Sequence, residues 1–299
     1  MIELTCEIPS DLAQPLEDFF CELPHSPWIL FNAPPPAPIS LSGYFDSENE
    51  AMDAWADLRK IFPTLQPNPT CISLADNDWK EAYKANLHPW HYDTLHWVPE
   101  WHRIDYPVSP PDAAAIVYFD AGLAFGTGDH PTTRLCAIRL VEFLKTRPAP
   151  QDTRVIDAGC GSGILSLSAA KLGCSKVFGF DCDPDAVRVS IANRTANALP
   201  EHNPTFLLTN IEDGLRTGGP ADIILANIIS DVLCAHATKL LNALAPGGTL
   251  VLSGILAHEK DAVRTLFSAK AASLWGAPPA NIDSRTLGEW ADITLTRPA

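Results

Sequence analysis

Along the first 75 residues, short segments in which apolar and polar residues alternate are separated by segments with helical spacing of the apolar positions. The strand-like segments are residues 2–8, 27–32, 39–45 and 70–75, and the helical ones are residues 10–23 and 46–62. Period-two alternation is typical of strands, and a repeat of three to four residues is typical of amphipathic helices. The order β-α-β-β-α-β predicts a small α+β ferredoxin-like domain over residues 1–76.

The next segment, residues 77–112, is rich in aromatic side chains. Four tryptophans and four histidines lie close together here: Trp79, Trp90, Trp97, Trp101, His88, His91, His96 and His102. So many large rings indicate a packed linker, and we expect a short helix and a strand between two domains. The histidines have no neighbouring cysteine and no recognisable ligand spacing, so we expect no metal site.

From residue 113 to residue 299, apolar strands alternate with helical segments. The strands are residues 154–159, 176–181, 205–210, 221–228 and 249–255, and the helices are residues 163–173, 184–198, 229–244 and 257–270. This β-α alternation with fully apolar strands predicts a doubly wound α/β fold, whose mainly parallel sheet is covered on both faces. The last segment, residues 291–297, alternates and is expected to be an edge strand.

A glycine-rich sequence, DAGCGSG, joins the first of these strands to the helix that follows it. Asp157, Gly159, Gly161 and Gly163 form the pattern D-x-G-x-G-x-G. Glycines let a ligand approach the backbone, and the helix start offers free N–H groups. The pattern resembles the loop of Rossmann-like methyltransferases that use S-adenosylmethionine, so these four residues are predicted to bind that cofactor. A nicotinamide dinucleotide, whose loop reads G-x-G-x-x-G, and a plain glycine turn are the alternatives.

Polar residues also follow the next two strands. Asp181 ends the second strand, where a carboxylate can accept hydrogen bonds from both ribose hydroxyls. Asn210 and Ile211 follow the third strand and are predicted to contact adenine. Asn210, or Glu212 in its place, would meet the exocyclic amine, and Ile211 would pack on the ring. The alternative for this segment is a surface turn.

A second glycine-rich segment, AFGTGDHPTT at residues 124–133, precedes the strands of the sheet. We expect it to fold over the ligand as a lid, with the Phe125 ring against a positively charged sulfur. The predicted cofactor contacts are Phe125, Gly126, Thr127, Gly128 and Thr132, and the predicted catalytic residues in this segment are Thr127 and His130. The alternative is a loop without a role in the site.

Asn227 ends the fourth strand in the sequence ANII. We predict that its carbonyl oxygen holds an aliphatic amine, and that Asn227 is both catalytic and in contact with the cofactor. No Pro-Pro-aromatic sequence follows it, so stacking on a flipped base is not indicated. The alternative is that Asn227 only caps the end of the strand.

The net charge of −15 disfavours sequence-independent binding to nucleic acid and favours a basic partner. The eight cysteines contain no C-x-x-C pair, and no apolar run is long enough to span a membrane. The first residues lack the features of a signal peptide. We therefore expect a cytoplasmic protein with reduced cysteines, and the sequence leaves its oligomeric state open.

Several motifs together resemble one family, the methyltransferases of ribosomal protein L11. They are DW at 78–79, HP at 88–89, GLAFGTGDHPTT at 122–133, VIDAGCGSGIL at 155–165, DCDP at 181–184, ANII at 226–229, LSGIL at 252–256 and EW at 289–290. The resemblance implies an N-terminal domain that captures the substrate, a linker, and a catalytic domain over residues 113–299. The sequence departs from the family pattern at Asp129, where threonine is usual.

The resemblance also implies a reaction: methyl transfer from S-adenosylmethionine to lysine side chains and the N-terminal amine of a basic ribosomal protein. Two alternatives stay open. One is a lysine methyltransferase for another protein, such as an electron-transfer flavoprotein. The other is a non-catalytic module that has kept the cofactor pocket.

Overall fold

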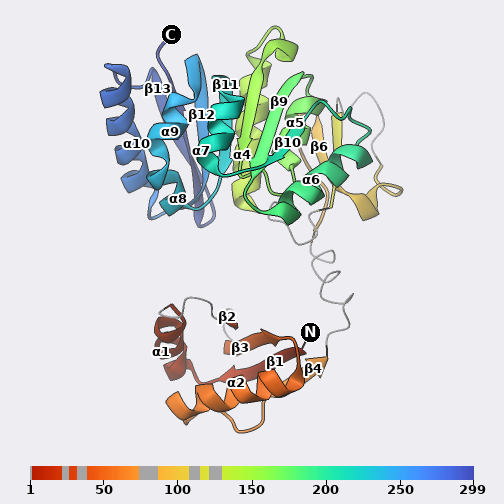
Figure 1. The fold of residues 1–299 in the computed structure, drawn as a ribbon, viewed down its shortest axis with the longest axis vertical. Helices are drawn as coiled ribbons and strands as arrows, with labels where there is room; N and C mark the ends of the chain where they lie inside the picture. Colours follow the sequence, from red (N-terminus) through yellow and green to blue (C-terminus); the bar gives the residue numbers. More distant parts are fainter. Residues whose placement is uncertain (1, 22–26, 32–38, 74–86, 108–114, 121–129) are drawn as a thin grey trace. The chain divides into compact units, whose positions relative to one another are not determined.

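A computed structural model of the chain describes residues 2–21, 27–31, 39–73, 87–107, 115–120 and 130–299 (Figure 1). Contacts along the chain divide it into two compact units, Met1–Asn86 and Leu87–Ala299. In the described part of the chain, no helix is both long enough and apolar enough to cross a membrane.

The first unit is a four-stranded antiparallel sheet with two helices. Its elements are β1 (Ile2–Ile8), α1 (Ser10–Cys21), β2 (Trp28–Phe31), β3 (Ile39–Phe45), α2 (Glu48–Ile61) and β4 (Thr70–Ser73). The strand order is β2-β3-β1-β4, and Leu4, Leu41 and Trp55 are fully buried between sheet and helices. Ser47 accepts a hydrogen bond from the Glu50 N–H and so begins α2. The predicted ferredoxin-like order is confirmed.

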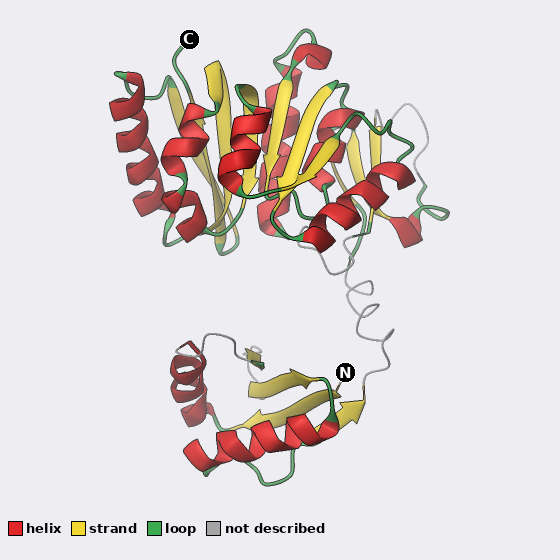
Figure 2. Ribbon diagram, viewed as in Figure 1, coloured by secondary structure: helices red, strands yellow, loops and turns green. Residues whose placement is uncertain are grey.

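The second unit is built on a seven-stranded sheet in the order β10-β9-β8-β11-β12-β14-β13 (Figure 2). Its strands are β8 (Arg154–Ala158), β9 (Lys176–Asp181), β10 (Thr205–Leu208), β11 (Ala221–Asn227), β12 (Leu244–Leu256), β13 (Asn281–Leu287) and β14 (Trp290–Thr296). The strands from β10 to β12 are parallel, and β14 runs antiparallel to both of its neighbours. This is the predicted Rossmann-like sheet.

Helices lie on both faces of this sheet, as Figure 2 shows. They are α4 (Pro131–Lys145), α5 (Ile164–Lys171), α6 (Pro184–Ala196), α7 (Ile211–Gly218), α8 (Ser230–Ala235), α9 (Ala237–Asn242) and α10 (Lys260–Trp275). Contacts link α4 to α5 and α5 to α6, and a second set of contacts links α7, α9 and α10. Along the sheet, β9 lies on one side of β8 and β11 on the other, so the strand order reverses at β8. Ligands of doubly wound folds bind at such a point, beyond the carboxyl ends of the strands.

The prediction that residues 291–297 form an edge strand is wrong. β14 lies between β12 and β13, and β13 is the edge. The alternation was misleading because the polar residue Asp292 is also fully buried. Arg139 of α4 reaches it with two hydrogen bonds of 2.7 and 2.8 Å, and this pairing allows a carboxylate to be buried in the sheet.

The described part of the aromatic segment packs within the second unit. No α-helix is among the described residues of this segment, and residues 77–86 and 108–112 lie outside them, so the expected short helix stays a prediction. In place of the expected single strand, β5 (Trp90–Tyr92) and β6 (Leu95–Pro99) form a small sheet with β7 (Ala115–Phe119). The rings of Trp90 and Trp97 stack with centroids 4.0 Å apart, and the Trp97 indole donates a 2.8 Å hydrogen bond to Ser168 of α5. Among the described residues, no cluster of His, Cys, Asp or Glu is arranged to hold a metal ion.

Candidate active site

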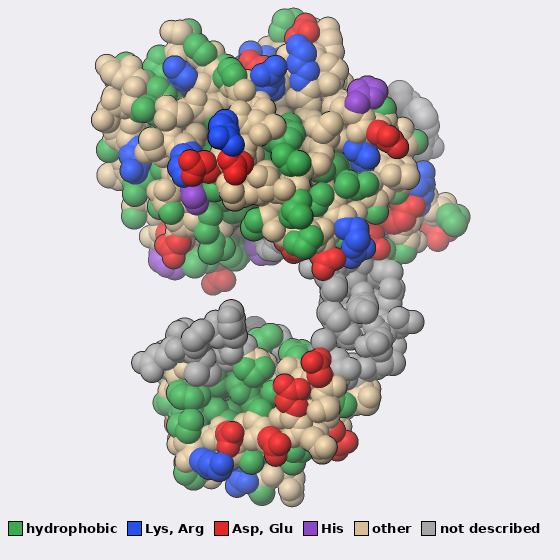
Figure 3. Space-filling model, viewed as in Figure 1, with side chains coloured by type: hydrophobic (Ala, Val, Ile, Leu, Met, Phe, Trp, Pro, Cys, Tyr) green, Lys and Arg blue, Asp and Glu red, His purple; other side chains and the backbone are tan. Residues whose placement is uncertain are grey.

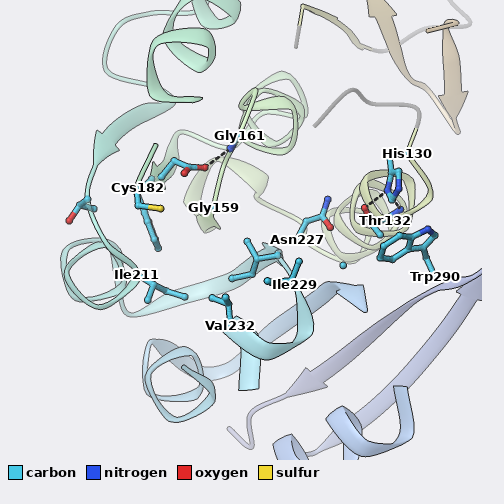
Figure 4. Close-up of a pocket in the computed structure, with 15 residues that line it drawn as sticks. His130, Thr132, Gly159, Gly161, Cys182, Ile211, Asn227, Ile229, Val232 and Trp290 are labelled. Carbon is cyan, nitrogen blue, oxygen red and sulfur yellow. Dashed lines mark hydrogen bonds between the residues drawn. The ribbon is translucent and has the colours of Figure 1, made fainter. Parts of the chain in front are cut away.

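A cavity of about 590 Å³ lies at the carboxyl ends of β8, β9 and β11, where the strand order reverses (Figure 4). Most of its polar lining residues lie at two ends. The Asp181 end consists of Gly161, Asp181, Cys182, Thr209 and Ile211, and the Asn227 end consists of His130, Thr132, Asn227 and Trp290. Gly159, Phe180, Ile228, Ile229, Val232 and Gly254 complete the lining, which is mainly apolar.

The glycine loop after β8 forms one wall of the cavity. Gly159 and Gly161 line it with φ angles of 70° and 51°. A Cβ atom on Gly159 would lie 2.6 Å from the Ile228 side chain, a distance that real side chains do not adopt. Glycine is therefore required here both for the left-handed backbone and for the close approach to Ile228.

Two other residues of the predicted loop support the wall from behind. Gly163 begins α5 with a φ of 78°, and a Cβ atom there would meet Ser190 at 2.8 Å. Asp157 is buried and accepts hydrogen bonds from the Ser166 N–H and hydroxyl, at 3.0 and 2.7 Å. Burial raises the pKa of the Asp157 carboxyl to about 6. Neither residue is among those that line the cavity; both fix the loop against the helices.

Asp181, at the end of β9, presents its carboxylate to the cavity. One oxygen accepts the Gly161 N–H at 2.9 Å, shown as a dashed line in Figure 4, and the other accepts the Asp183 N–H at 3.0 Å. A carboxylate has about four acceptor sites, so each oxygen keeps capacity for a further donor. The backbone thus orients the Asp181 carboxylate before any ligand binds.

Of the two residues predicted to contact adenine after β10, one lines the cavity and the other does not. Ile211 lines the cavity as predicted, but Asn210 is exposed and begins α7 by accepting the Asp213 N–H at 2.9 Å. Thr209, which the sequence did not single out, lines the cavity next to them. The alternative candidate, Glu212, pairs with Lys239 on the surface.

Asn227 ends β11 with only 8% of its surface exposed. Its Nδ2 donates a 3.3 Å hydrogen bond to Thr133 Oγ1. Its Oδ1 is buried and has no hydrogen-bond partner among the residues that the structure describes. A buried carbonyl oxygen without a donor is rare and unfavourable, so this oxygen marks a place where a ligand donor can bind.

His130, Thr132 and Trp290 lie together beside Asn227 (Figure 4). His130 begins α4, and its Nδ1 lies 2.7 Å from Thr132 Oγ1 and accepts the Thr132 N–H at 3.4 Å. Because an N–H can only donate, Nδ1 is an acceptor, and in the neutral ring the proton lies on Nε2. The Trp290 ring meets the His130 ring edge-on, with centroids 4.9 Å apart.

Comparisons with known proteins agree with this geometry. The profile of the ribosomal protein L11 methyltransferase (PrmA) family matches residues 32–297. The chain belongs to this family. It is 35% identical to the ribosomal protein L11 methyltransferase of Pelobacter propionicus, over 100% of this chain and 98% of that protein. With the protein of the same name from Geobacter metallireducens it is 32% identical, over 97% and 95%.

A solved structure of the family shares the fold. The ribosomal protein L11 methylase of Lactobacillus delbrueckii subsp. bulgaricus superposes with a TM-score of 0.59 and is 27% identical, covering 71% of this chain and all of that one. As a member of the family, the chain is an S-adenosylmethionine-dependent methyltransferase.

The cavity fits the cofactor of this family. Its volume lies in the range of small-molecule sites, about 300–1,000 Å³, and Gly159 and Gly161 line it with backbone that carries no side chain. Asp181 has acceptor capacity suited to ribose hydroxyls, and Ile211 offers an apolar surface to a base. The predicted contacts Phe125, Gly126, Thr127 and Gly128 lie outside the described residues, so these four assignments stay predictions.

The methyltransferase site also contains side-chain contacts that the sequence did not predict. Trp290 was noted only as part of a motif, and Thr133 only as one of the lid threonines that supply hydroxyls, without a partner. Both contact residues that are distant in the sequence: the Trp290 ring contacts His130, and Thr133 accepts a hydrogen bond from Asn227. A pattern of single residues along the chain gives no signal for such pairs.

Proposed function

We propose that this chain methylates amino groups of ribosomal protein L11, at lysine side chains and at the N-terminal amine. The observation that carries the choice of an amine is at Asn227, a residue that lines the cofactor cavity and whose buried Oδ1 has no partner among the described residues. The names of the family and of its members support ribosomal protein L11 as the substrate.

Gly159, Gly161, Asp181 and Ile211 would hold the nucleoside part of the cofactor. When bound, S-adenosylmethionine supplies a methyl group on a positively charged sulfur. The Asp181 carboxylate would accept the ribose hydroxyls, because the Gly161 and Asp183 N–H groups already fix its orientation. Holding both reactants in line is the main contribution that such a site makes to the rate.

Asn227 would orient the acceptor nitrogen. A carbonyl oxygen accepts an N–H of the amine and leaves the nitrogen lone pair free to attack. A lysine amine in water is mostly protonated at neutral pH, with a pKa near about 10.4. The apolar side chains of Ile228 and Ile229 next to Asn227 disfavour the charged ammonium and lower that pKa. The residues therefore favour entry of a neutral amine without a strong base in the described part of the site.

His130 has a structural role in this arrangement. Its Nδ1 is engaged by Thr132 at the start of α4, so in the neutral ring this nitrogen is not available to take a proton from the amine. We propose that His130 shapes the Asn227 end by fixing the first turn of α4 and the Trp290 ring. The direct catalytic role predicted for His130 is not needed for this step, and that of Thr127, which lies outside the described residues, stays a prediction.

The N-terminal unit is suited to recognise a basic substrate. Residues 1–86 contain 14 Asp and Glu against 4 Lys and Arg, whereas residues 87–299 contain 22 against 17. Figure 3 shows several acidic side chains on the visible face of this unit. Clustered charge of one sign speeds the encounter with a partner of opposite charge. We propose that residues 1–76 form the substrate-recognition domain.

A methyl-transfer assay with purified components tests this function. The chain is incubated with methyl-labelled S-adenosylmethionine and purified ribosomal protein L11, and the labelled positions are mapped by mass spectrometry. We expect label on lysine Nζ atoms and on the N-terminal nitrogen, and a much lower rate of labelling with the Asn227→Ala variant. Label on another protein of a cell extract, with L11 unlabelled, would contradict the substrate. Absence of any label in both would contradict the activity.

A further inference from the structure

The first turn of α4 is joined to the ends of two neighbouring strands by two buried hydrogen bonds. Asn227 Nδ2 donates to Thr133 Oγ1 at 3.3 Å, and Ser253 Oγ donates to the Thr132 carbonyl at 2.9 Å. Asn227 and Ser253 are direct partners in the β11–β12 ladder. Thr132 and Thr133 are 1% exposed and Ser253 is fully buried. The helix start and the strand ends therefore form one connected unit.

The orientation of the Asn227 amide decides what the cavity offers to an amine. The two ends of an amide have nearly the same shape, but one accepts and the other donates. With the carbonyl oxygen toward the acceptor, the amide receives an N–H and leaves the nitrogen lone pair free. With the NH2 group there instead, it would donate into that lone pair and block the attack.

A threonine hydroxyl can accept or donate a hydrogen bond, and in the structure Thr133 accepts from Asn227, which corresponds to the first of these two orientations. The Thr133 oxygen accepts from Nδ2, and Oδ1 is then the atom left buried without a partner in the described part of the chain. We propose that Thr133 is a positioning residue that fixes the carbonyl oxygen of Asn227 toward the acceptor nitrogen. The Ser253 bond to the Thr132 carbonyl keeps Thr133 within reach of Asn227.

The rest of α4 is fixed strongly enough for one hydroxyl to matter. Arg139, two turns further along the helix, is buried and pairs with Asp292 and Asp283. Burial opposes its charge, but the hydrogen bonds and charges of both carboxylates outweigh this and raise the pKa of the Arg139 guanidinium. The helix is thereby held against β13 and β14, and it cannot shift freely to replace a lost contact at Thr133.

The proposal rests on the proposed amine methylation, so its test includes a ligand that reports on the amide without turnover. Sinefungin is an analogue of S-adenosylmethionine that carries an amino group where the cofactor carries its methyl group, whereas S-adenosylhomocysteine has neither. The affinities of both are measured by calorimetry for wild type, Thr133→Val and Thr133→Ser. Thr294→Val removes a buried threonine hydroxyl of β14 outside the cavity lining and serves as the control.

We expect wild type to prefer sinefungin, and Thr133→Val to lose about 10-fold of this preference with unchanged affinity for S-adenosylhomocysteine. In the methyl-transfer assay, the same variant should lose about 30-fold in kcat with little change in KM for the cofactor. Thr133→Ser should restore both quantities, and Thr294→Val should change neither.

Equal losses of affinity for the two ligands in Thr133→Val would show a structural role and overturn the proposal. So would an unchanged preference for sinefungin, or a failure of Thr133→Ser to restore it. If L11 is not methylated by wild type, the proposed function fails, but the ligand preference still decides whether Thr133 orients Asn227.

Discussion

The two ends of the cavity are built in different ways. At the Asp181 end, both carboxylate oxygens already accept backbone N–H groups, from Gly161 and Asp183. At the Asn227 end, a buried carbonyl oxygen has no partner among the described residues. The first arrangement is satisfied before a ligand arrives, and the second is completed by one. The difference suggests that the Asp181 end determines cofactor affinity, whereas the Asn227 end determines the rate of transfer.

Removal of the Asn227 amide is expected to have the largest effect. Asn227→Ala should lower kcat by about 1,000-fold, because a preoriented polar group at the reacting atoms contributes about that much. Calorimetry with S-adenosylhomocysteine should show affinity within about threefold of wild type. Asn242→Ala, at an exposed asparagine of α9, is the control and should match wild type. Equal losses in rate and affinity would erase the difference between the two ends.

The next largest effect concerns the carboxyl group behind the Asp181 end. Burial raises the pKa of folded Asp157 to about 6, above its unfolded value of about 3.9. The folded state therefore keeps its proton longer, and its stability falls as pH rises from about 4 to about 6. Asp157→Asn removes this dependence and keeps an acceptor for Ser166.

Urea unfolding of wild type and Asp157→Asn between pH 4 and pH 7 measures this effect. The difference in unfolding free energy should change by about 3 kcal/mol in favour of the variant between pH 4 and 6, and then stay level. A difference that does not vary with pH would mean that Asp157 is not buried in the way described.

A smaller effect is expected for the ribose contact. Asp181→Ala should weaken binding of S-adenosylhomocysteine by about 30-fold, since hydrogen bonds to a charged group contribute about 1.5–3 kcal/mol. The kcat of this variant, measured at saturating cofactor, should stay close to that of wild type. Asp185→Ala, a nearby exposed residue that pairs with Arg188, controls for loss of an acidic side chain. Unchanged affinity in Asp181→Ala would refute the ribose assignment.

The smallest expected effect is a shift in pH dependence. Asn227→Asp places a carboxylate at the Asn227 end, where it would stabilise the ammonium form and raise the pKa of the acceptor amine. The profile of kcat/KM against pH should therefore move up by about one pH unit in the residual activity. The same profile measured for Asp181→Ala should keep its wild-type position. A shift with Asp181→Ala but none with Asn227→Asp would reverse the roles of the two ends.

The sequence predicted the Asp181 end better than the Asn227 end. Gly159, Gly161, Asp181 and Ile211 lie at or just after the carboxyl ends of strands, so a local pattern and the rules of parallel sheets suffice to bring them together. The predicted cavity contact at Asn210 was wrong by one position. Asparagine is a preferred helix cap, and Asn210 begins α7 without lining the cavity. The local pattern left Thr209 unmarked.

The Asn227 end depends on contacts between distant segments. Asn227 and Thr133 are 94 residues apart, and the position of Trp290 follows from the placement of β14 inside the sheet. That placement was mispredicted because Asp292 reads as a solvent-facing residue until Arg139 is known to pair with it. Single-residue patterns cannot predict such tertiary pairs, although they did mark Asn227, which lines the cavity.

A crystal structure of the protein with S-adenosylhomocysteine tests the central claim most directly. We predict that both ribose hydroxyls bind the Asp181 carboxylate, that the base lies against Ile211, and that the sulfur faces the Asn227 end. A nucleoside bound outside this cavity, or a sulfur turned away from Asn227, would contradict the account.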